Sequence, residues 1–311
     1  METIDLSTLS PLAGRWEVNP EVAVYLGPQE NAFAPFGVAI APGSFRSGIA
    51  RVTVVFPRQQ SVGRIAFGHS AATAAYFSAG IGGYGYAYVL DEYIPNRGWQ
   101  GIRTEGGEQN LRAGRPYRID VQVRGQRVML SVDGVRVLEG NLPRPMIDDR
   151  FGLFAWGDAP VQFSNFEVES GKPQAFVVMQ YSSPYDVLFS DVIAPVAREV
   201  GFSAYRAADV CRPGLVLQDI LEGLIESEVV IAEITPPNQN VFYELGYAHA
   251  LSKPTILLAE RNQRGDLPFD IRGYRVIFYD NTIGGKKEVS DSLRRHLMSI
   301  RSGSSVPNDG V

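Results

Sequence analysis

Cysteine and histidine are scarce in this chain of 311 residues. Its one cysteine, Cys211, excludes an internal disulfide bond and is compatible with a reducing compartment such as the cytoplasm. Its three histidines (His69, His249 and His296) are scattered, and with a single cysteine they lack the ligand spacing of a zinc site. We therefore expect no bound metal.

Long apolar runs are absent as well. No stretch approaches the roughly 20 apolar residues that span a bilayer, and METIDLSTLSPLAGRW at residues 1–16 is too polar for a signal peptide. The formal net charge of −5 is spread over both halves of the chain, so neither half has the basic patch of a nucleic-acid-binding protein. The expectation is a cytoplasmic protein with neither a membrane nor a nucleic acid as its partner.

Residues 1–170 have the pattern of short antiparallel strands. Tyr117–Val123 and Val128–Val132 alternate apolar and polar residues. Asp133-Gly134 follows, and this dipeptide favours a two-residue hairpin turn because both positions need a positive φ. Further strands are predicted at Val135–Leu138, Ala50–Phe56, Arg64–His69, Ala74–Ile81, Tyr84–Leu90, Phe151–Ala155 and Val161–Val168. Together they predict an all-β antiparallel sandwich.

Residues 174–302 instead alternate buried strands with helices. The predicted strands are Ala175–Met179, Ser203–Arg206, Val229–Ile234, Thr255–Leu258 and Arg275–Tyr279. The predicted helices are Asp186–Val200, Leu215–Ser227, one opening near Asn240 and one near Lys287–Ile300, and Pro195 should interrupt the first of them. This alternation predicts an α/β domain with a flavodoxin-like, doubly wound parallel sheet. The polar residues 303–311 are expected to form a flexible tail.

The loops after the carboxyl ends of parallel strands form the ligand crevice of such a sheet. The predicted crevice contains Gln180, Tyr181, Arg206, Asp209, Asn238, Glu244, Phe269 and Arg272. Glu244 is expected in the first turn of its helix, where a carboxylate stabilises the helix dipole by about 0.3–1 kcal/mol. The same carboxylate could instead react with a sugar, so both interpretations stand at this point.

The residues of the predicted crevice exclude several kinds of catalytic site. It has no glycine-rich phosphate loop with a lysine, and His249 is more than a turn beyond Glu244, so neither a Ser-His-Asp nor a Cys-His arrangement is available. A carboxylate beside a ribosyl C1′ can stabilise an oxocarbenium-like transition state or attack it as a nucleophile. The fitting substrate is an N-glycoside, namely a nucleoside, a nucleotide or NAD. In the last case no separate cofactor is needed, because NAD would itself be the substrate.

Three ordered segments within residues 174–282 resemble the TIR-like and nucleoside 2-deoxyribosyltransferase-like superfamily of bacterial proteins. They are AFVVMQYSSPYDVLFSDVIAPVAREVGFSAYRAADV, VVIAEITPPNQNVFYELGYAHAL and PFDIRGYRVIFY. The resemblance implies that Glu244 is the catalytic carboxylate, and that the reaction is cleavage of the nicotinamide–ribose bond of NAD or transfer of a deoxyribosyl group. It also implies an assembly-activated effector of antiphage defence, hence a homo-oligomer. The strand-end acid, commonly Asp in the related pattern, is Glu233 here.

Our hypothesis from this resemblance is an NAD glycohydrolase, in which Glu244 stabilises or traps the ribosyl cation. Tyr181 and Phe269 would stack on a base, and Asp209 and Asn238 would hold ribose hydroxyls. Gln180 completes the predicted contacts with the substrate. Arg272 could meet a pyrophosphate or pair with Asp270, and both readings stay open. The alternatives are a nucleoside 2-deoxyribosyltransferase with the same carboxylate and a non-catalytic nucleotide-binding sensor.

The first half more weakly resembles concanavalin-like, or laminin-G-like, sandwich domains. The resemblance is carried by GRPYRIDVQVRGQRVMLSVDGVRVLEGN and GLFAWGDAPVQFSNFEV. The paired-carboxylate motif of glucanases with that fold (Glu-x-Asp-x-x-Glu) is absent, since Tyr93 follows Asp91-Glu92. We therefore expect a non-catalytic domain that supports assembly or binds an unknown activator.

Overall fold

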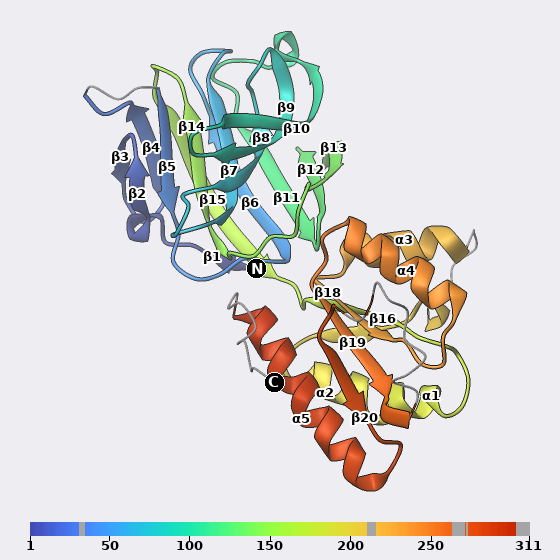
Figure 1. The fold of residues 1–311 in the computed structure, drawn as a ribbon. Coiled ribbons are helices and arrows are strands. Elements are labelled where there is room, and N and C mark those ends of the chain that lie inside the picture. Colours follow the sequence, from blue (N-terminus) through green and yellow to red (C-terminus); the bar gives the residue numbers. More distant parts are fainter. Residues whose placement is uncertain (31–34, 210–215, 263–270, 272, 303–311) are drawn as a thin grey trace. The chain divides into compact units, whose positions relative to one another are not determined.

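The computed structural model describes residues 1–30, 35–209, 216–262, 271 and 273–302 (Figure 1). Internal contacts divide the chain into two compact units. The first comprises Met1–Val123 and Arg127–Gly171, and the second comprises Arg124–Gln126 and the chain from Lys172 onward. The chain thus leaves the first unit at Gly171, where the strand-rich pattern of the sequence ends.

The first unit consists of two antiparallel sheets. One has eight strands in the order β13-β12-β11-β6-β15-β4-β3, with β1 paired to β15. Its strands are β1 (Glu2–Thr3), β3 (Arg15–Val18), β4 (Val22–Gly27), β6 (Gly48–Val55), β11 (Tyr117–Arg124), β12 (Arg127–Val132), β13 (Val135–Asn141) and β15 (Val161–Ser170). The other has seven strands in the order β10-β9-β8-β7-β14-β5-β2. These are β2 (Ser10–Ala13), β5 (Phe36–Ile40), β7 (Val62–His69), β8 (Tyr76–Ile81), β9 (Tyr86–Ile94), β10 (Gly98–Gly107) and β14 (Arg150–Trp156).

Side-chain alternation places the core between these sheets. In β11, Ile119 and Val121 are fully buried, whereas Arg118, Asp120 and Gln122, which alternate with them, are exposed or half-buried. The predicted hairpin is confirmed, because Asp133 (φ 51°) and Gly134 (φ 81°) both have positive φ between β12 and β13. Two short 3-10 helices, Leu6–Thr8 and Glu108–Asn110, complete the unit.

The seven-stranded sheet is also buried on its second face. There an aromatic cluster covers the sheet, formed by Phe36, Tyr76, Tyr93, Trp99, Phe154 and Trp156. Arg64 on β7 and Asp91 on β9 form an ion pair whose side chains are 3% and 0% exposed. Ser78 and Tyr84 also donate hydrogen bonds to the Asp91 carboxylate. This polar network lines a cavity of about 270 Å³ together with Trp99 and Trp156.

The second unit contains a five-stranded sheet in the order β17-β16-β18-β19-β20, with every pair of neighbours parallel. This is the order predicted for a flavodoxin-like sheet. The strands are β16 (Gln174–Val178), β17 (Ser203–Tyr205), β18 (Val229–Glu233), β19 (Thr255–Glu260) and β20 (Val276–Tyr279). The helices are α1 (Tyr185–Leu188), α2 (Ala194–Glu199), α3 (Val216–Glu226), α4 (Gln239–Ala250) and α5 (Ile283–Arg301), with a 3-10 turn η4 (Ala207–Asp209).

The helices cover both faces of this sheet. Figure 1 shows α3 and α4 on one face and α1, α2 and α5 on the other, in agreement with two separate apolar clusters. Val230 and Ala232 of β18 face α4, whereas Val229 and Ile231 face the opposite side. Within the described residues, no helix combines the length and the apolar composition that a membrane span needs.

The predicted helix Asp186–Val200 is interrupted ahead of Pro195. A π-helical turn, Phe189–Ile193, separates α1 from α2, and Pro195 lies at the start of α2. Proline lacks an N–H donor and its ring clashes with the carbonyl four residues earlier, so a regular α-helix cannot pass through this position. The wider turn relieves that clash and keeps Val192 and Ile193 buried against the sheet.

Candidate functional site

Asn238 fixes the start of helix α4 after strand β18. Its Oδ1 accepts hydrogen bonds from the backbone N–H groups of Asn240 (2.9 Å) and Val241 (3.4 Å), which makes it the N-cap. The helix begins at Gln239, so the prediction that Glu244 lies in the first turn is wrong. It lies in the second turn, because the asparagine cap starts the helix earlier than expected. Since the dipole effect falls off within the first turn, Glu244 is not explained as a helix-end charge.

Glu244 is buried, and it has no partner of opposite charge among the described residues. Its side chain lies beside Leu245 in the half of the helix that packs on the sheet, and the residue is 9% exposed. No hydrogen bond or ion pair to its carboxylate is formed by the residues that the structure describes. Burial raises the pKa of this carboxyl to about 7. A carboxylate in this state is stabilised by any cation that a ligand brings to it.

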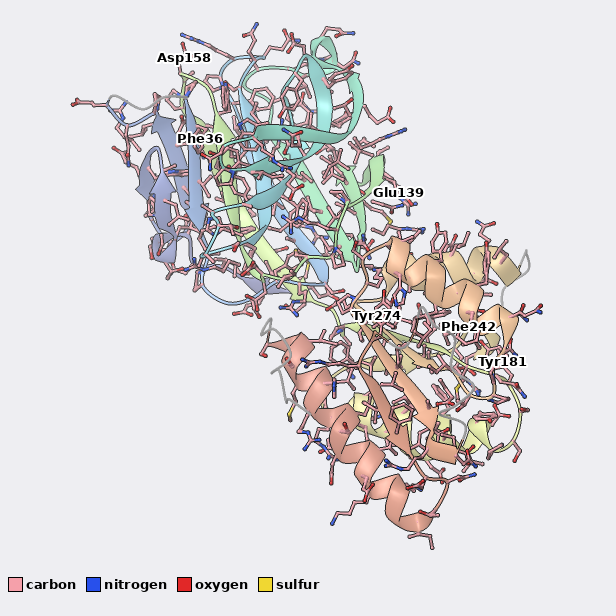
Figure 2. The ribbon with its side chains drawn as sticks, viewed as in Figure 1. Phe36, Glu139, Asp158, Tyr181, Phe242 and Tyr274 are labelled. Carbon is pink, nitrogen blue, oxygen red and sulfur yellow. The ribbon has the colours of Figure 1, made fainter. Side chains whose placement is uncertain are left out.

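Tyr181 lies in the loop after β16 (Figure 2), close enough to Glu244 to be affected by its charge. Burial of its phenol and then the negative charge of Glu244 raise the pKa of Tyr181, and the backbone N–H groups of Ala208 and Ala207 partly offset that rise. The ring remains 46% exposed, so it can still contact a ligand. The neighbouring Gln180 donates through Nε2 to the Ser182 hydroxyl at 2.8 Å, which ties down the same loop.

Asp209 is held by Arg206 in the loop after β17. Its carboxylate accepts from the Arg206 Nη2 at 3.0 Å and from the Arg206 backbone N–H at 2.9 Å. Burial alone would raise the pKa of Asp209, but these bonds lower it below its ordinary value. Asp186, at the start of α1, accepts from the Arg206 Nη1 at 2.7 Å. Arg206 was predicted in the crevice, but its bond to Asp186 joins residues 20 positions apart and has no local signal in the sequence.

Glu233 ends strand β18 and points to the face of the sheet opposite α4. It is 1% exposed, and its Oε1 accepts the backbone N–H of Thr235 at 2.9 Å. Burial raises the pKa of Glu233 to about 8, although the hydrogen bonds from Thr235 act in the other direction. The Tyr279 hydroxyl on β20 neighbours the same carboxyl. Glu233 is therefore protonated at neutral pH, which suits a structural group better than a nucleophile.

Replacing Glu233 with glutamine should change how stability depends on pH. The folded-state pKa lies above the unfolded value, so the folded protein binds the extra proton between about pH 4.5 and 8 and loses stability as pH rises through that window. Relative to wild type, Glu233→Gln should gain a few kcal/mol by the upper end, since one pKa unit corresponds to about 1.36 kcal/mol. Urea unfolding, followed by helical circular dichroism at several pH values, measures this. If the free energies of unfolding of the two proteins change in the same way with pH, the raised pKa of Glu233 is contradicted.

The structure brings Gln180, Tyr181, Asp209, Asn238 and Glu244 to loops and a helix at the carboxyl edge of one sheet. Phe269 and Arg272, and Asp270 with them, lie outside the described residues. No cluster of three or more potential metal ligands occurs in the described parts of the chain. A cavity of about 380 Å³ between α1 and α5 contains none of the predicted site residues.

No family model matches this chain, and no curated protein matches it. Solved structures that share parts of its fold include the following three. The carbohydrate-binding module CBM66 from Bacillus subtilis is 14% identical, with a TM-score of 0.45 over 55% of this chain and 99% of that one. The Clostridium botulinum CMP N-glycosidase BcmB is 20% identical, with a TM-score of 0.32 over 39% of this chain and 96% of that one. The TIR domain of the Toll-related receptor TRR-2 from Hydra magnipapillata is 15% identical, with a TM-score of 0.33 over 41% and 97%. These similarities are too low to assign a function.

Proposed function

We propose that the second unit is an N-glycosyl hydrolase that cleaves the nicotinamide–ribose bond of NAD, with Glu244 as its catalytic carboxylate. One observation carries this proposal: Glu244 is a nearly buried carboxylate that no described residue neutralises, at the ligand-binding edge of a doubly wound sheet. A structural carboxylate at that depth is normally paired or hydrogen-bonded, because burial of an unpaired charge is costly. An unpaired one is a candidate functional group.

The reaction needs little beyond this carboxylate. As the glycosidic bond breaks, its electron pair passes to the nicotinamide nitrogen and cancels the positive charge of the ring. The ribosyl C1′ becomes electron-poor, and the Glu244 carboxylate stabilises that charge or forms a transient ester with it. Water then adds to C1′, giving ADP-ribose, nicotinamide and one proton. The positive nicotinamide ring also suits an unpaired carboxylate in the ground state.

Other groups of the site have proposed roles in substrate binding. Tyr181 offers a half-exposed ring on which a base can stack, and its phenol lies near Glu244. Arg206 donates to both carboxylate oxygens of Asp209, but the side chain stays 37% exposed, so a ribose hydroxyl can still reach it. The Asn238 side-chain oxygen caps α4, which leaves its amide N–H₂ for a substrate. The roles of Phe269 and Arg272 remain predictions from the sequence.

The test is to incubate the purified protein with NAD and measure free nicotinamide, at low and at high protein concentration. Release that rises more than in proportion to concentration would support activation by assembly, as the resemblance to effectors of bacterial antiphage defence implies. If ribosyl groups instead move to an added free base, the protein is a transferase. If NAD binds by calorimetry and is never consumed, with or without assembly, the nucleotide-binding sensor is the better reading.

The pH profile should follow the carboxyl group of Glu244. Its pKa of about 7 in the free protein means that the reactive anion is lost as pH falls through neutrality. We therefore expect kcat/KM to fall about tenfold for each pH unit below that pKa and to level off above it. Initial rates at low NAD concentration, measured across the pH range, give this profile. A midpoint near the ordinary glutamate pKa of 4.5 would show that the group controlling activity is not a buried Glu244.

A further inference from the structure

Arg206 joins three segments at the carboxyl edge of the parallel sheet. It follows β17 directly, and its guanidinium donates to Asp186 in α1 and to Asp209 in η4 at 2.7 and 3.0 Å. The Arg206 side chain is only 16% exposed, so solvent cannot replace it between the two carboxylates. Removal of this guanidinium would leave two like charges facing each other. Arg206 therefore fixes the position of α1 and η4 relative to β17.

The same residue also holds Tyr181. The Arg206 Cζ lies 5.5 Å from the Tyr181 ring centroid and 4.3 Å from that of Phe189, within the range of cation–π contacts. The backbone N–H groups of the next two residues, Ala207 and Ala208, act on the Tyr181 hydroxyl and lower its pKa. One short segment thus contacts both the ring and the hydroxyl of a tyrosine that lies near Glu244.

We propose that Arg206 is a positioning residue, which holds Tyr181 in place beside Glu244 so that a bound base meets a fixed ring. This inference rests on the proposed function, in which Tyr181 contacts the substrate and Glu244 acts on it. Arg206 itself touches no reacting atom. Its planar fork can serve two carboxylates and stack on rings at once, whereas the point charge of lysine cannot. The chemistry at this position thus requires arginine and not merely a positive charge.

Arg206→Lys tests the proposal, with Arg294→Lys as a matched control. Arg294 on α5 also bridges two carboxylates, those of Glu199 and Asp291, yet contacts no residue of the proposed site. We expect Arg206→Lys to lower kcat/KM for NAD by about tenfold or more, mainly through KM, because a misplaced ring weakens binding. Arg294→Lys should match wild type. Equal kinetics of the two variants would overturn the proposal.

A double-mutant cycle separates positioning from a general structural role. If Arg206 acts through Tyr181, then Arg206→Lys should cost less than about threefold in a Tyr181→Ala background, because interacting residues are not additive. If the two substitutions instead lower kcat/KM by factors that multiply in the double variant, Arg206 acts independently of Tyr181, and the proposal is wrong. Should Arg206→Lys not fold, Asp186→Asn, which frees only the α1 arm of the guanidinium, should raise KM in the same direction by less. An unchanged KM in that variant would count against the proposal.

A readout without turnover keeps the two proposals distinct. In protein labelled with 13C-tyrosine, the NMR signal of Tyr181 is identified by its loss in Tyr181→Phe. It should shift in Arg206→Lys and stay in place in Arg294→Lys. If wild type releases no nicotinamide but the signal shifts as expected, the proposed function fails while the positioning of Tyr181 stands. If NAD is hydrolysed and the signal does not move, the positioning role fails and the function stands.

Discussion

Replacing Glu244 with glutamine should abolish nicotinamide release, with a loss in kcat of about a thousandfold or more and a much smaller change in KM. Glutamine keeps the size and shape of the side chain but cannot carry the negative charge that stabilises the ribosyl cation. Substrate contacts elsewhere in the site are retained, so binding should persist. The measurement is nicotinamide release under saturating NAD, with the affinity for NAD taken from calorimetry.

The variant should not lose activity by unfolding. Burial raises the pKa of Glu244 above its unfolded value, so its ionisation costs stability as pH rises, and glutamine removes that cost. Glu244→Gln should accordingly melt at the same temperature as wild type or higher. Glu288→Gln, an exposed position on α5, serves as the matched control and should keep full activity. Unchanged release by Glu244→Gln would show that another group performs the chemistry.

For Glu244, the sequence predicts the correct edge of the sheet but not the correct turn of the helix. The alternation of buried strands and helices is sufficient to place this residue at the carboxyl edge of a parallel sheet, since the sheet order is the predicted one. Its turn within α4 depended on where the helix begins, and the Asn238 cap sets that start at Gln239 rather than near Asn240. This earlier start places Glu244 beyond the first turn, and helix boundaries are the weakest part of any pattern-based prediction.

Contacts between segments distant in sequence were beyond prediction. The interruption at Pro195 could be foreseen, because proline acts locally through its missing donor and its ring. The Arg206–Asp186 ion pair could not, since it depends on how α1 settles against β17. Glu233 offered a partial signal, being the one charge in the run Val229–Ile234, but its raised pKa comes from burial, which depends on how the rest of the domain packs over this strand.

The sandwich was predicted as a class more completely than as a set of strands. Alternating residues and Gly-rich turns mark strands β6 to β9 and β11 to β15, and these strands were predicted. Strand β10 was not. Strands β1 to β5 were missed. Pro11 and Gly14 break the alternation around β2 and β3, and β5 is buried on both faces by the aromatic cluster, so its pattern is continuous rather than alternating. The Arg64–Asp91 pair was missed because the two residues lie on different strands, β7 and β9, and meet only once the sheet has formed.

Because this ion pair is buried, Asp91→Ala should strongly lower the free energy of unfolding of the sandwich. Asp91 accepts from Arg64, Ser78 and Tyr84, and Arg64 is itself enclosed, with its Nε donating to the Gly82 carbonyl at 3.1 Å. Alanine would leave a guanidinium buried without its counter-charge and two hydroxyls without an acceptor. Breaking one half of a buried ion pair costs about 3–5 kcal/mol, which is a large part of the stability of an ordinary domain.

The tryptophans allow this loss to be measured in the full-length chain. Trp16, Trp99 and Trp156 are the only three in the sequence and all belong to the first unit, so urea unfolding followed by tryptophan fluorescence reports on that unit. The matched control is Asp158→Ala, which breaks the Arg58–Asp158 pair on the surface of the same unit. Both of its side chains are well exposed, so the expected loss there is below about 1 kcal/mol. An Asp91→Ala midpoint no lower than that of the control would mean that water or a shift of Arg64 relieves the charge. Recovery in Arg64→Met/Asp91→Leu would instead show that the unpaired charge, and not the lost contacts, sets the cost, because a buried pair is often replaceable by apolar residues of similar volume.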